Sequence, residues 1–416
     1  MIGLGNLALL NFIVTSFVSS RPFIPRDEND ADHNVGRYIV TLRDGLDASA
    51  VEEHIQRAAN IHALSSSPAV EVGRRWNIGS WNAYSCTMDG DTLTQIGSDE
   101  VVEMIEPDGA ISLMKHIVQQ DASWGLADLS HRVPNHTDYV YDSRAGEGTY
   151  AYVLDTGLLS THEEFEDRAF LGHNVVGGIF ADEVGHGTHV AGTIAGKTYG
   201  VAKKAKVVSV KIFADTESYT SDLLEGMHWA VQDIITQKRQ NVSVINISAG
   251  GDLRESVNRA VEEAYKQGVL TVVAAGNYNQ DARYYSPASA PTAITVGSIG
   301  RDHTRSRFSD WGELVDIFAP GEQIKSAWIE TDQDTALLSG TSMSTPHVSG
   351  LILYLKSVVP DRMKTPGDSL NVLRELATDG AIRDPHGSKN FLAYNGNGVV
   401  IFTGDLARSL ANKDRS

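Results

Sequence analysis

The chain has 416 residues, 21% of them charged and 41% hydrophobic, and its formal net charge is −18. This length allows a large buried core and more than one domain, and the composition is typical of a globular protein. The negative charge excludes the classes of protein that bind nucleic acid or anionic membranes through a basic surface. We therefore expect neither partner, and we expect a monomer.

The N-terminal segment contains an apolar run from Leu7 to Val18, which is too short to cross a bilayer. Val18 and Ser20 are small residues at the spacing that a signal peptidase accepts, so residues 1–20 are predicted to be a cleaved secretion signal. A buried N-terminal helix is the alternative interpretation. The chain has one cysteine, Cys86, which cannot form an internal disulfide and is predicted to be a small buried side chain.

Residues 37–106 have the pattern of a small α+β module. A helix with an acidic N-cap is predicted to start at Asp91. The order of predicted elements is βαββαβ, which is typical of a ferredoxin-like sandwich. Nothing in this module suggests catalysis. The predicted strands are 37–42, 70–78, 83–88 and 101–106, and the predicted helices lie around 51–59 and 91–96.

From Ile117 onward, near-continuous apolar runs alternate with helical patterns. Such runs suit parallel strands that are buried on both faces, so residues 117–416 are predicted to form a doubly wound α/β domain with a mostly parallel sheet. Active sites in such sheets lie beyond the carboxyl ends of the strands, and Asp155, Ser248 and Asn277 each follow a predicted strand. The predicted strands are 149–154, 207–212, 242–247, 269–274 and 293–296, and the helices between them are 222–239 and 253–267.

Three distant segments supply an acid, an imidazole and a hydroxyl in the order Asp155, His186 and Ser342. A serine alcohol is a weak nucleophile that needs a base, so we predict His186 as the base and Asp155 as the group that orients it in one hydrogen-bonded line. Ser342 is predicted to open a helix with Pro346 in its first turn, where backbone N–H groups favour developing negative charge. A simple helix cap is the alternative role for Ser342.

Two further residues need a decision between roles. His189 lies one turn beyond His186 and is predicted to be buried in helix packing, whereas the glycines that flank His186 favour it as the base. A zinc site at this histidine pair is the alternative, although the spacing and the missing glutamate do not match the zincin motif. Asn277 is predicted to donate to the oxyanion of a tetrahedral intermediate, together with the backbone N–H of Ser342. Its alternative role is a left-handed turn.

The three segments that contain Asp155, His186 and Ser342, together with the chain between them, resemble the subtilase family, and within it the secreted fungal proteinase K-like group. The resemblance implies a serine endopeptidase of broad specificity that is made as a zymogen and acts through an acyl-enzyme. It also implies that residues 21–116 are a propeptide whose 37–106 module inhibits the peptidase domain. The tail of the propeptide, residues 110–116, is expected to lie in the substrate cleft and to be cut near His116–Ile117. Further segments that resemble the group are 124–126, 199–204, 285–289, 316–318 and 391–395.

The resemblance also predicts how a peptide binds, as an added strand between two exposed edges. Ser248, Ala249 and Gly250 resemble the edge that lines the S1 pocket. The opposite edge is usually glycine-rich in relatives, but here it contains Glu217 and Ser218. Glu217 could favour a basic substrate residue, and a solvated surface carboxylate is its alternative role.

Structural calcium is the cofactor that the resemblance implies. Its predicted ligands are the carbonyl groups of Pro291 and Ala293 and the carboxylate of Asp316, which are oxygen donors suited to a hard cation. Asp316 could instead cap a strand end. Three sequons are present, and Asn135 and Asn241 are the candidates for glycosylation, because Asn246 falls inside a predicted core strand.

Two other functions remain open from the sequence. A catalytically silent relative would act by binding or inhibition, although Asp155, His186, Asn277 and Ser342 are all present. An esterase would use the same groups on small esters.

Overall fold

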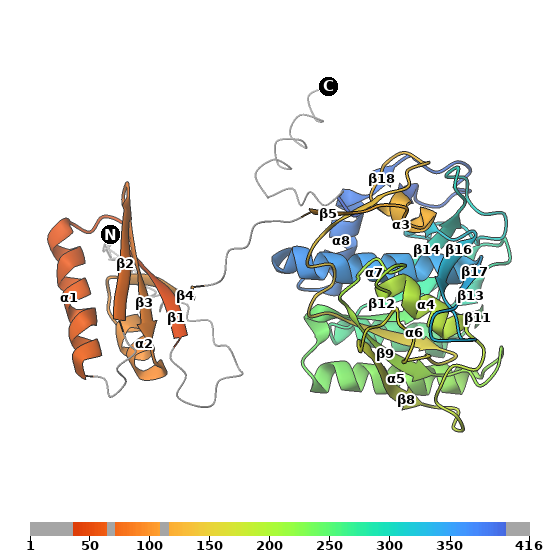
Figure 1. Ribbon diagram of the computed structural model, residues 1–416, viewed down its shortest axis with the longest axis horizontal. Coiled ribbons are helices and arrows are strands. Elements are labelled where there is room, and N and C mark those ends of the chain that lie inside the picture. The colour runs from red at the N-terminus through yellow and green to blue at the C-terminus, as the bar shows by residue number, and fades with distance from the viewer. Residues whose placement is uncertain (1–35, 65–70, 109–115, 397–416) are drawn as a thin grey trace, which may run out of the picture. The chain divides into compact units, whose positions relative to one another are not determined.

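The structure is a computed structural model that describes residues 36–64, 71–108 and 116–396. The chain forms two compact units that divide between Leu113 and Met114 (Figure 1). The predicted signal at 1–20 and most of the predicted cleft-binding tail at 110–116 lie outside the described residues. No helix in the described ranges is both long enough and apolar enough to cross a membrane.

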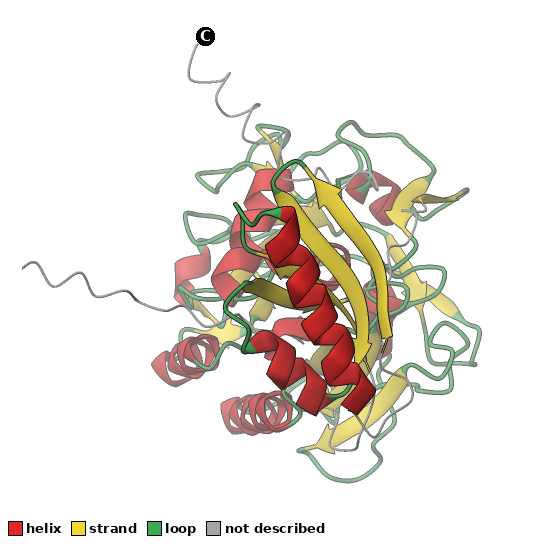
Figure 2. Cartoon of the chain, turned by 90° about the vertical axis from the view of Figure 1, so that its left-hand side faces the viewer, coloured by secondary structure: helices red, strands yellow, loops and turns green. Residues whose placement is uncertain are grey.

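The first unit is a four-stranded antiparallel sheet with two helices. Its strand order is β2-β3-β1-β4, which confirms the predicted βαββαβ sandwich. One apolar cluster joins both helices to the strands, so both helices cover the same face of the sheet (Figure 2). The elements are β1 (Gly36–Leu42), α1 (Ala48–Leu64), β2 (Glu71–Ile78), β3 (Trp81–Met88), α2 (Gly90–Gly97) and β4 (Val102–Pro107).

Two details of this unit concern sequence predictions. Cys86 is buried in β3 as predicted, and burial raises the pKa of its thiol to about 11. The predicted cap of α2 is wrong. The helix begins one residue earlier, at Gly90, and the extended Asp89 accepts the capping hydrogen bond from the backbone N–H of Thr92 at 2.8 Å. Asp91 therefore lies within the first turn.

The second unit is built on a nine-stranded sheet in the order β18-β19-β15-β14-β12-β10-β7-β9-β8. All neighbouring strands in it are parallel except the edge pair β18 and β19, which confirms a mostly parallel sheet. Its strands are β7 (Tyr150–Asp155), β8 (Ala169–Asn174), β9 (Lys206–Lys211), β10 (Ser243–Ile247), β12 (Thr271–Ala274), β14 (Ile294–Ile299), β15 (Ile317–Pro320), β18 (Thr378–Asp379) and β19 (Phe391–Leu392).

Three two-stranded sheets stand beside the main sheet in antiparallel pairs. Their strands are β5 (His116–Gln119) with β6 (Tyr139–Asp142), β11 (Gly251–Asp252) with β13 (Tyr285–Ser286), and β16 (Ile324–Ala327) with β17 (Thr335–Leu338). The helices of the unit are α3 (Trp124–Leu129), α4 (His186–Ala195), α5 (Thr220–Thr236), α6 (Glu255–Lys266), α7 (Thr341–Val358) and α8 (Pro366–Leu376), with 3₁₀ turns at Gln240–Val242, Ala282–Tyr284 and Pro360–Arg362.

Helices cover both faces of the main sheet, as the doubly wound prediction requires. Along β7, Ala151 and Val153 belong to the core cluster that contains α4 and α7, whereas Tyr152 and Leu154 belong to the cluster that contains α5 and α6. Successive side chains of a strand point to opposite faces, so this one strand contributes to both cores. Burial on both faces explains why apolar side chains predominate on both faces of the central strands.

Candidate active site

The carboxyl ends of β7, β10 and β12 meet at one edge of the sheet, and the predicted site residues gather there. Asp155 ends β7, Ser248 follows β10, and Asn277 lies shortly after β12. His186 is the first residue of α4, and Ser342 lies in the first turn of α7. The fold therefore brings together side chains that are far apart in the sequence, at the edge where a doubly wound sheet binds ligands.

His186 and Asp155 make the central contact of the site. Nδ1 of His186 lies 2.7 Å from Oδ1 of Asp155, which also accepts the backbone N–H of Thr156 at 2.8 Å. The second carboxylate oxygen is buried and has no hydrogen-bond partner within the described residues. Burial lowers the pKa of His186, but the charge of Asp155 and its hydrogen bond to the ring outweigh burial and raise that pKa overall. An imidazole held in this way is a general base with a fixed orientation.

The start of α4 is fixed by a second buried carboxylate, Asp182. Its Oδ1 accepts the backbone N–H of Gly185 at 2.8 Å, and its Oδ2 accepts both the backbone N–H and the hydroxyl of Thr188, at 2.9 and 2.7 Å. Burial raises the pKa of Asp182, but these hydrogen bonds outweigh it and lower the pKa overall. Gly185 has a φ of 99°, and a Cβ there would lie 2.6 Å from the ring of Trp328. Asp182 thus positions His186.

Sequence analysis missed Asp182. The signal that could have found it is an aspartate three residues before the glycine that precedes the helix, since carboxylates in such positions accept the free N–H groups of a first turn.

Ser342 donates a hydrogen bond from Oγ to the carbonyl oxygen of Ser248 at 2.9 Å. No hydrogen bond joins this hydroxyl to the His186 ring in the described part of the chain. The predicted line of three groups is therefore present between Asp155 and His186 only. Rotation about one side-chain bond moves the Ser342 oxygen without any change in the backbone.

The turn that holds Ser342 differs from the prediction at Pro346. The helix begins at Thr341, so Pro346 lies in the second turn and removes the donor that would reach the carbonyl oxygen of Ser342. The hydroxyl of Ser248 replaces that donor at 3.0 Å and in turn accepts from Nδ2 of Asn246 at 3.0 Å. The predicted edge residue Ser248 therefore also stabilises the turn that holds Ser342.

Asn277 is oriented by its neighbour in α7. Its Oδ1 accepts the backbone N–H and the hydroxyl of Thr341, at 2.8 and 2.9 Å, which leaves the Nδ2 group as a donor. The left-handed residues of this segment are Gly276 and Asn279, with φ of 114° and 54°. Asn277 itself does not take the left-handed turn that was its alternative role. The Thr341 N–H is used by Asn277, and the Met343 N–H donates to the carbonyl of Gly340 at 3.0 Å. The Asn277 amide and the backbone N–H of Ser342 are therefore the groups left to donate to an oxyanion.

These groups line one cleft of about 520 Å³. Most of the residues that line it are small or apolar. Such a lining suits the side chains of an extended polypeptide better than a charged small molecule. Its lining residues are Asp155, Thr156, Val184, His186, Phe213, Thr216, Ser248, Ala249, Gly250, Ala274, Ala275, Gly276, Asn277, Tyr278, Tyr285, Ser286, Ala288, Trp328, Leu338, Thr341 and Ser342.

Comparison with known proteins gives two family matches. Residues 146–398 match the subtilase family, and residues 37–114 match the peptidase inhibitor I9 family. The chain is 47% identical to alkaline protease 1 of Aspergillus flavus over 87% of this chain and 91% of that protein. It is also 47% identical to the alkaline proteinase of Hapsidospora chrysogena, over 87% and 92% of the two chains.

The chain belongs to the subtilase family. A solved structure, that of a cold-adapted subtilisin-like serine proteinase, matches with a TM-score of 0.61 and 39% identity over 66% of this chain and 99% of that chain. The protein is therefore a serine endopeptidase that is made as a zymogen with an inhibitory N-terminal domain. The predicted family and its fold are confirmed.

Other predicted residues of this subtilase take different positions. His189 is fully buried and its Nε2 contacts the carbonyl oxygens of Ile324 and Ala336 at 3.0 and 3.2 Å, as expected of a side chain in helix packing. Burial lowers the pKa of His189 to about 4. Ala249 and Gly250 line the cleft, but Glu217 and Ser218 are not among its lining residues. A role for those two residues in substrate binding stays a prediction.

The residues predicted to bind calcium do not fit a cation. Oδ1 of Asp316 accepts hydrogen bonds from the side chains of Lys389 and Arg374, at 2.7 and 3.0 Å. Asp316 is 6% exposed, so two positive groups already neutralise a buried carboxylate. Calcium binding by Pro291, Ala293 and Asp316 would require both cationic side chains to leave. We therefore assign no step to calcium at this position.

Proposed function

We propose that Ser342 is the nucleophile of a secreted endopeptidase of broad specificity, with His186 as general base and Asp155 as its orienting carboxylate. The observation that carries the proposal is the 2.7 Å contact between His186 and Asp155 in the cleft that Ser342 also lines. Asn277 then acts as an oxyanion donor, because Thr341 fixes its Oδ1 and leaves its Nδ2 free to donate.

The reaction follows from these groups. Ser342 Oγ turns from the carbonyl of Ser248 toward Nε2 of His186 and attacks the scissile carbonyl carbon, while His186 takes its proton. The oxyanion accepts hydrogen bonds from Asn277 Nδ2 and the Ser342 backbone N–H. His186 then gives the proton to the leaving amine, and an acyl-enzyme remains. Water, deprotonated by His186, hydrolyses the ester and restores Ser342.

We infer that the substrate binds as an extended strand along Ser248, Ala249 and Gly250. These residues carry small side chains or none at the cleft wall, so the backbone of a peptide can approach and form strand-like hydrogen bonds. Apolar rings of Phe213 and Trp328 also line the cleft, which favours apolar substrate residues over charged ones. Broad specificity follows from contacts made mainly to the peptide backbone.

We also propose that the enzyme is secreted and that the propeptide ends near the start of β5, at His116–Ile117. The apolar run at the N-terminus supports secretion. Asn135 and Asn241 are exposed sequon residues and are the proposed glycan sites, whereas Asn246 is fully buried in β10.

The test is proteolysis of casein by the processed wild-type enzyme and by the Ser342→Ala variant. We expect the wild type to cleave casein and to lose activity with a serine-directed phosphonate, and the variant to lose roughly 10⁶-fold in turnover, as for the equivalent change in subtilisin. Cleavage of small esters without casein cleavage would favour an esterase. Casein cleavage that persists in the variant would refute Ser342 as nucleophile.

A further inference from the structure

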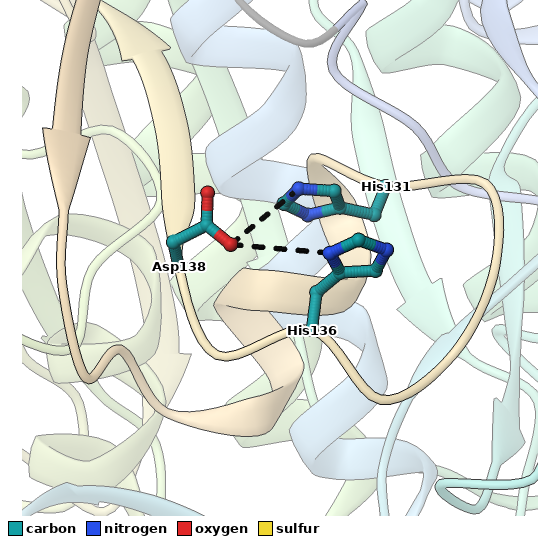
Figure 3. A group of neighbouring side chains, drawn as sticks. All are labelled: His131, His136 and Asp138. Atoms are coloured by element: carbon teal, nitrogen blue, oxygen red, sulfur yellow. Dashed lines mark ion pairs between the residues drawn. The ribbon is translucent and has the colours of Figure 1, made fainter.

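One cluster of metal-ligating side chains lies outside the cleft, in the loop between α3 and β6. His131 and His136 come from this loop, and Asp138 directly precedes β6 (Figure 3). Among the described residues this is the one group of three histidine, cysteine or acidic side chains with ligand atoms all within 4.8 Å of one another. The peptidase mechanism uses none of the three.

The Asp138 carboxylate is turned toward both imidazole rings (Figure 3). Its Oδ1 lies 3.6 Å from Nε2 of His131 and 3.9 Å from Nδ1 of His136. Both separations are longer than a hydrogen bond, so direct contacts do not fill the space between the three atoms. Bonds of about 2.0–2.1 Å to a tetrahedral zinc ion set neighbouring ligand atoms roughly 3.3 Å apart, which is close to this spacing.

The tautomer of His131 is fixed by the backbone. Its Nδ1 lies 2.9 Å from the carbonyl oxygen of Ala127, and because a carbonyl only accepts, Nδ1 carries the proton. In the neutral ring Nε2 then presents its lone pair, and Nε2 is the atom that faces Asp138. A histidine ligand whose other ring nitrogen donates to a carbonyl is the usual outer-sphere arrangement of a metal site.

The second ring must turn to complete the site. The rings of His131 and His136 stack with centroids 3.7 Å apart and planes 8° apart. The lone pair of a ring nitrogen lies in the plane of its ring, so two parallel rings cannot both direct a lone pair at one ion. His136, whose side chain is 39% exposed, has to rotate about its side-chain bonds when the ion binds. The nearby cation Arg132 is directed elsewhere, because its guanidinium donates to the carbonyl of Leu376 and lies over the ring of Tyr394.

We propose that His131, His136 and Asp138 bind a divalent transition-metal ion, and that Zn²⁺ is the best match. Two imidazole nitrogens and one carboxylate oxygen are a zinc-type donor set, and they do not suit calcium, which takes oxygen ligands. The side chains of His136 and Asp138 are 39% and 29% exposed, so water can complete the coordination. The ion would join the end of α3 to β6, whose partner β5 contains the proposed start of the processed enzyme.

The test is a Zn²⁺ titration by calorimetry on the processed enzyme, blocked with a phosphonate against self-digestion and freed of metal by a chelator. We expect one high-affinity zinc ion per chain. His136→Asn and Asp138→Asn should each weaken it by more than about 100-fold, since loss of even an outer-sphere partner typically costs about 10- to 100-fold. His228→Asn, a change to an exposed histidine on α5, is the matched control and should bind as the wild type does.

Thermal unfolding gives a second readout. Zinc should raise the Tm of the wild type and of the His228→Asn variant, and should leave the Tm of His136→Asn unchanged, because a ligand stabilises only the form that binds it. Metal-free His136→Asn should unfold near the metal-free wild type. The proposal would be overturned if the wild type bound no measurable zinc. It would also be overturned if the wild type and the three variants, at His136, Asp138 and His228, all bound zinc with equal affinity.

Discussion

At the scale of single residues, the environment of His186 determines how the enzyme responds to pH. Asp155 is 1% exposed and holds the imidazole at 2.7 Å, and the resulting pKa of His186 is above its ordinary value of 6.5. A base must be neutral to accept the proton of Ser342. Activity should therefore be absent well below the raised pKa and should appear as pH rises through it.

The corresponding prediction concerns kcat/KM measured across pH on a peptide substrate. The acidic limb of the wild-type profile should titrate above pH 6.5, the ordinary value for the ring. In Asp155→Asn the limb should move to lower pH, because the charge that favours the protonated ring is gone, and kcat should fall by about 10⁴-fold. An unmoved limb in this variant would mean that Asp155 does not set the pKa of His186.

Asp182 acts through the backbone at the start of α4 and makes no contact with the His186 ring. The Asp182→Asn variant loses a charged acceptor for Gly185 and Thr188, so we expect about 2 kcal/mol of destabilisation in urea unfolding at neutral pH, together with lower kcat. The pKa of Asp182 is depressed, so its contribution is present above the ordinary pKa and is lost as pH falls through the depressed value.

Glu225 on α5 offers a matched control, since it is exposed and Glu225→Gln makes the same change of charge. Glu183, next to Asp182, is unsuitable because its carboxylate lies 4.0 Å from Nζ of the buried Lys211. The Glu225→Gln control should unfold and cleave substrate as the wild type does. An Asp182→Asn enzyme as stable as Glu225→Gln would contradict the positioning role.

At the scale of elements, Asp316 connects four of them. Its Oδ2 accepts the backbone N–H of Thr295 in β14 at 3.1 Å. It directly precedes β15, and its carboxylate contacts Arg374 of α8 and Lys389, which leads into β19. A buried carboxylate with two cationic partners needs no metal for neutrality, and removal of one partner from such a set is strongly destabilising. This arrangement fixes the C-terminal part of the unit to the main sheet through side chains.

We therefore predict that calcium does not stabilise the enzyme through Asp316. The change in Tm on adding millimolar calcium to metal-free, phosphonate-blocked enzyme should be the same in the wild type and in Asp316→Asn. The absolute Tm of the variant should be lower, because the neutral amide removes the negative charge that Lys389 and Arg374 share. A calcium-dependent rise in Tm that disappears in Asp316→Asn would restore the sequence-based interpretation of this residue as a metal ligand.

The same elements indicate how far sequence reasoning reaches. Central strands such as β7 and β10 were predicted because burial on both faces makes most of their side chains apolar or aromatic. The edge strand β18 and its neighbour β19 have two residues each and carry no such pattern. The ion pairs of Asp316 join residues 58 and 73 positions apart, and no local spacing records contacts of that range.

The site was also predictable only in part. Asp155, His186 and Ser342 could be identified because each lies in a short motif, and an acid, an imidazole and a hydroxyl are the groups that nucleophilic catalysis by a serine needs. The second-turn position of Pro346 was not predictable, because it depends on where α7 begins, and helix boundaries are the least certain feature of a sequence-based assignment. Ser248 compensates for the lost donor from another element, which again requires the tertiary fold.

At the scale of the whole molecule, the chain carries its own inhibitor. The 36–108 unit has a separate apolar core, and it matches an inhibitor family, whereas the peptidase unit holds the complete set of proposed catalytic groups. A zymogen of this kind must lose the connection between the units before it acts on other proteins. The enzyme itself is the simplest agent for that cut, because its cleft accepts extended polypeptide.

We predict that full-length Ser342→Ala, purified and incubated alone, keeps both units in one chain. N-terminal sequencing of the wild type should instead give a start near Ile117. Ser256→Ala removes an exposed hydroxyl from α6 and serves as the control, which should be processed as the wild type is. Addition of a trace of active enzyme should then cut Ser342→Ala at the same bond, because its linker is intact. If Ser342→Ala produced this new N-terminus unaided, processing would not depend on the nucleophile that digests other proteins.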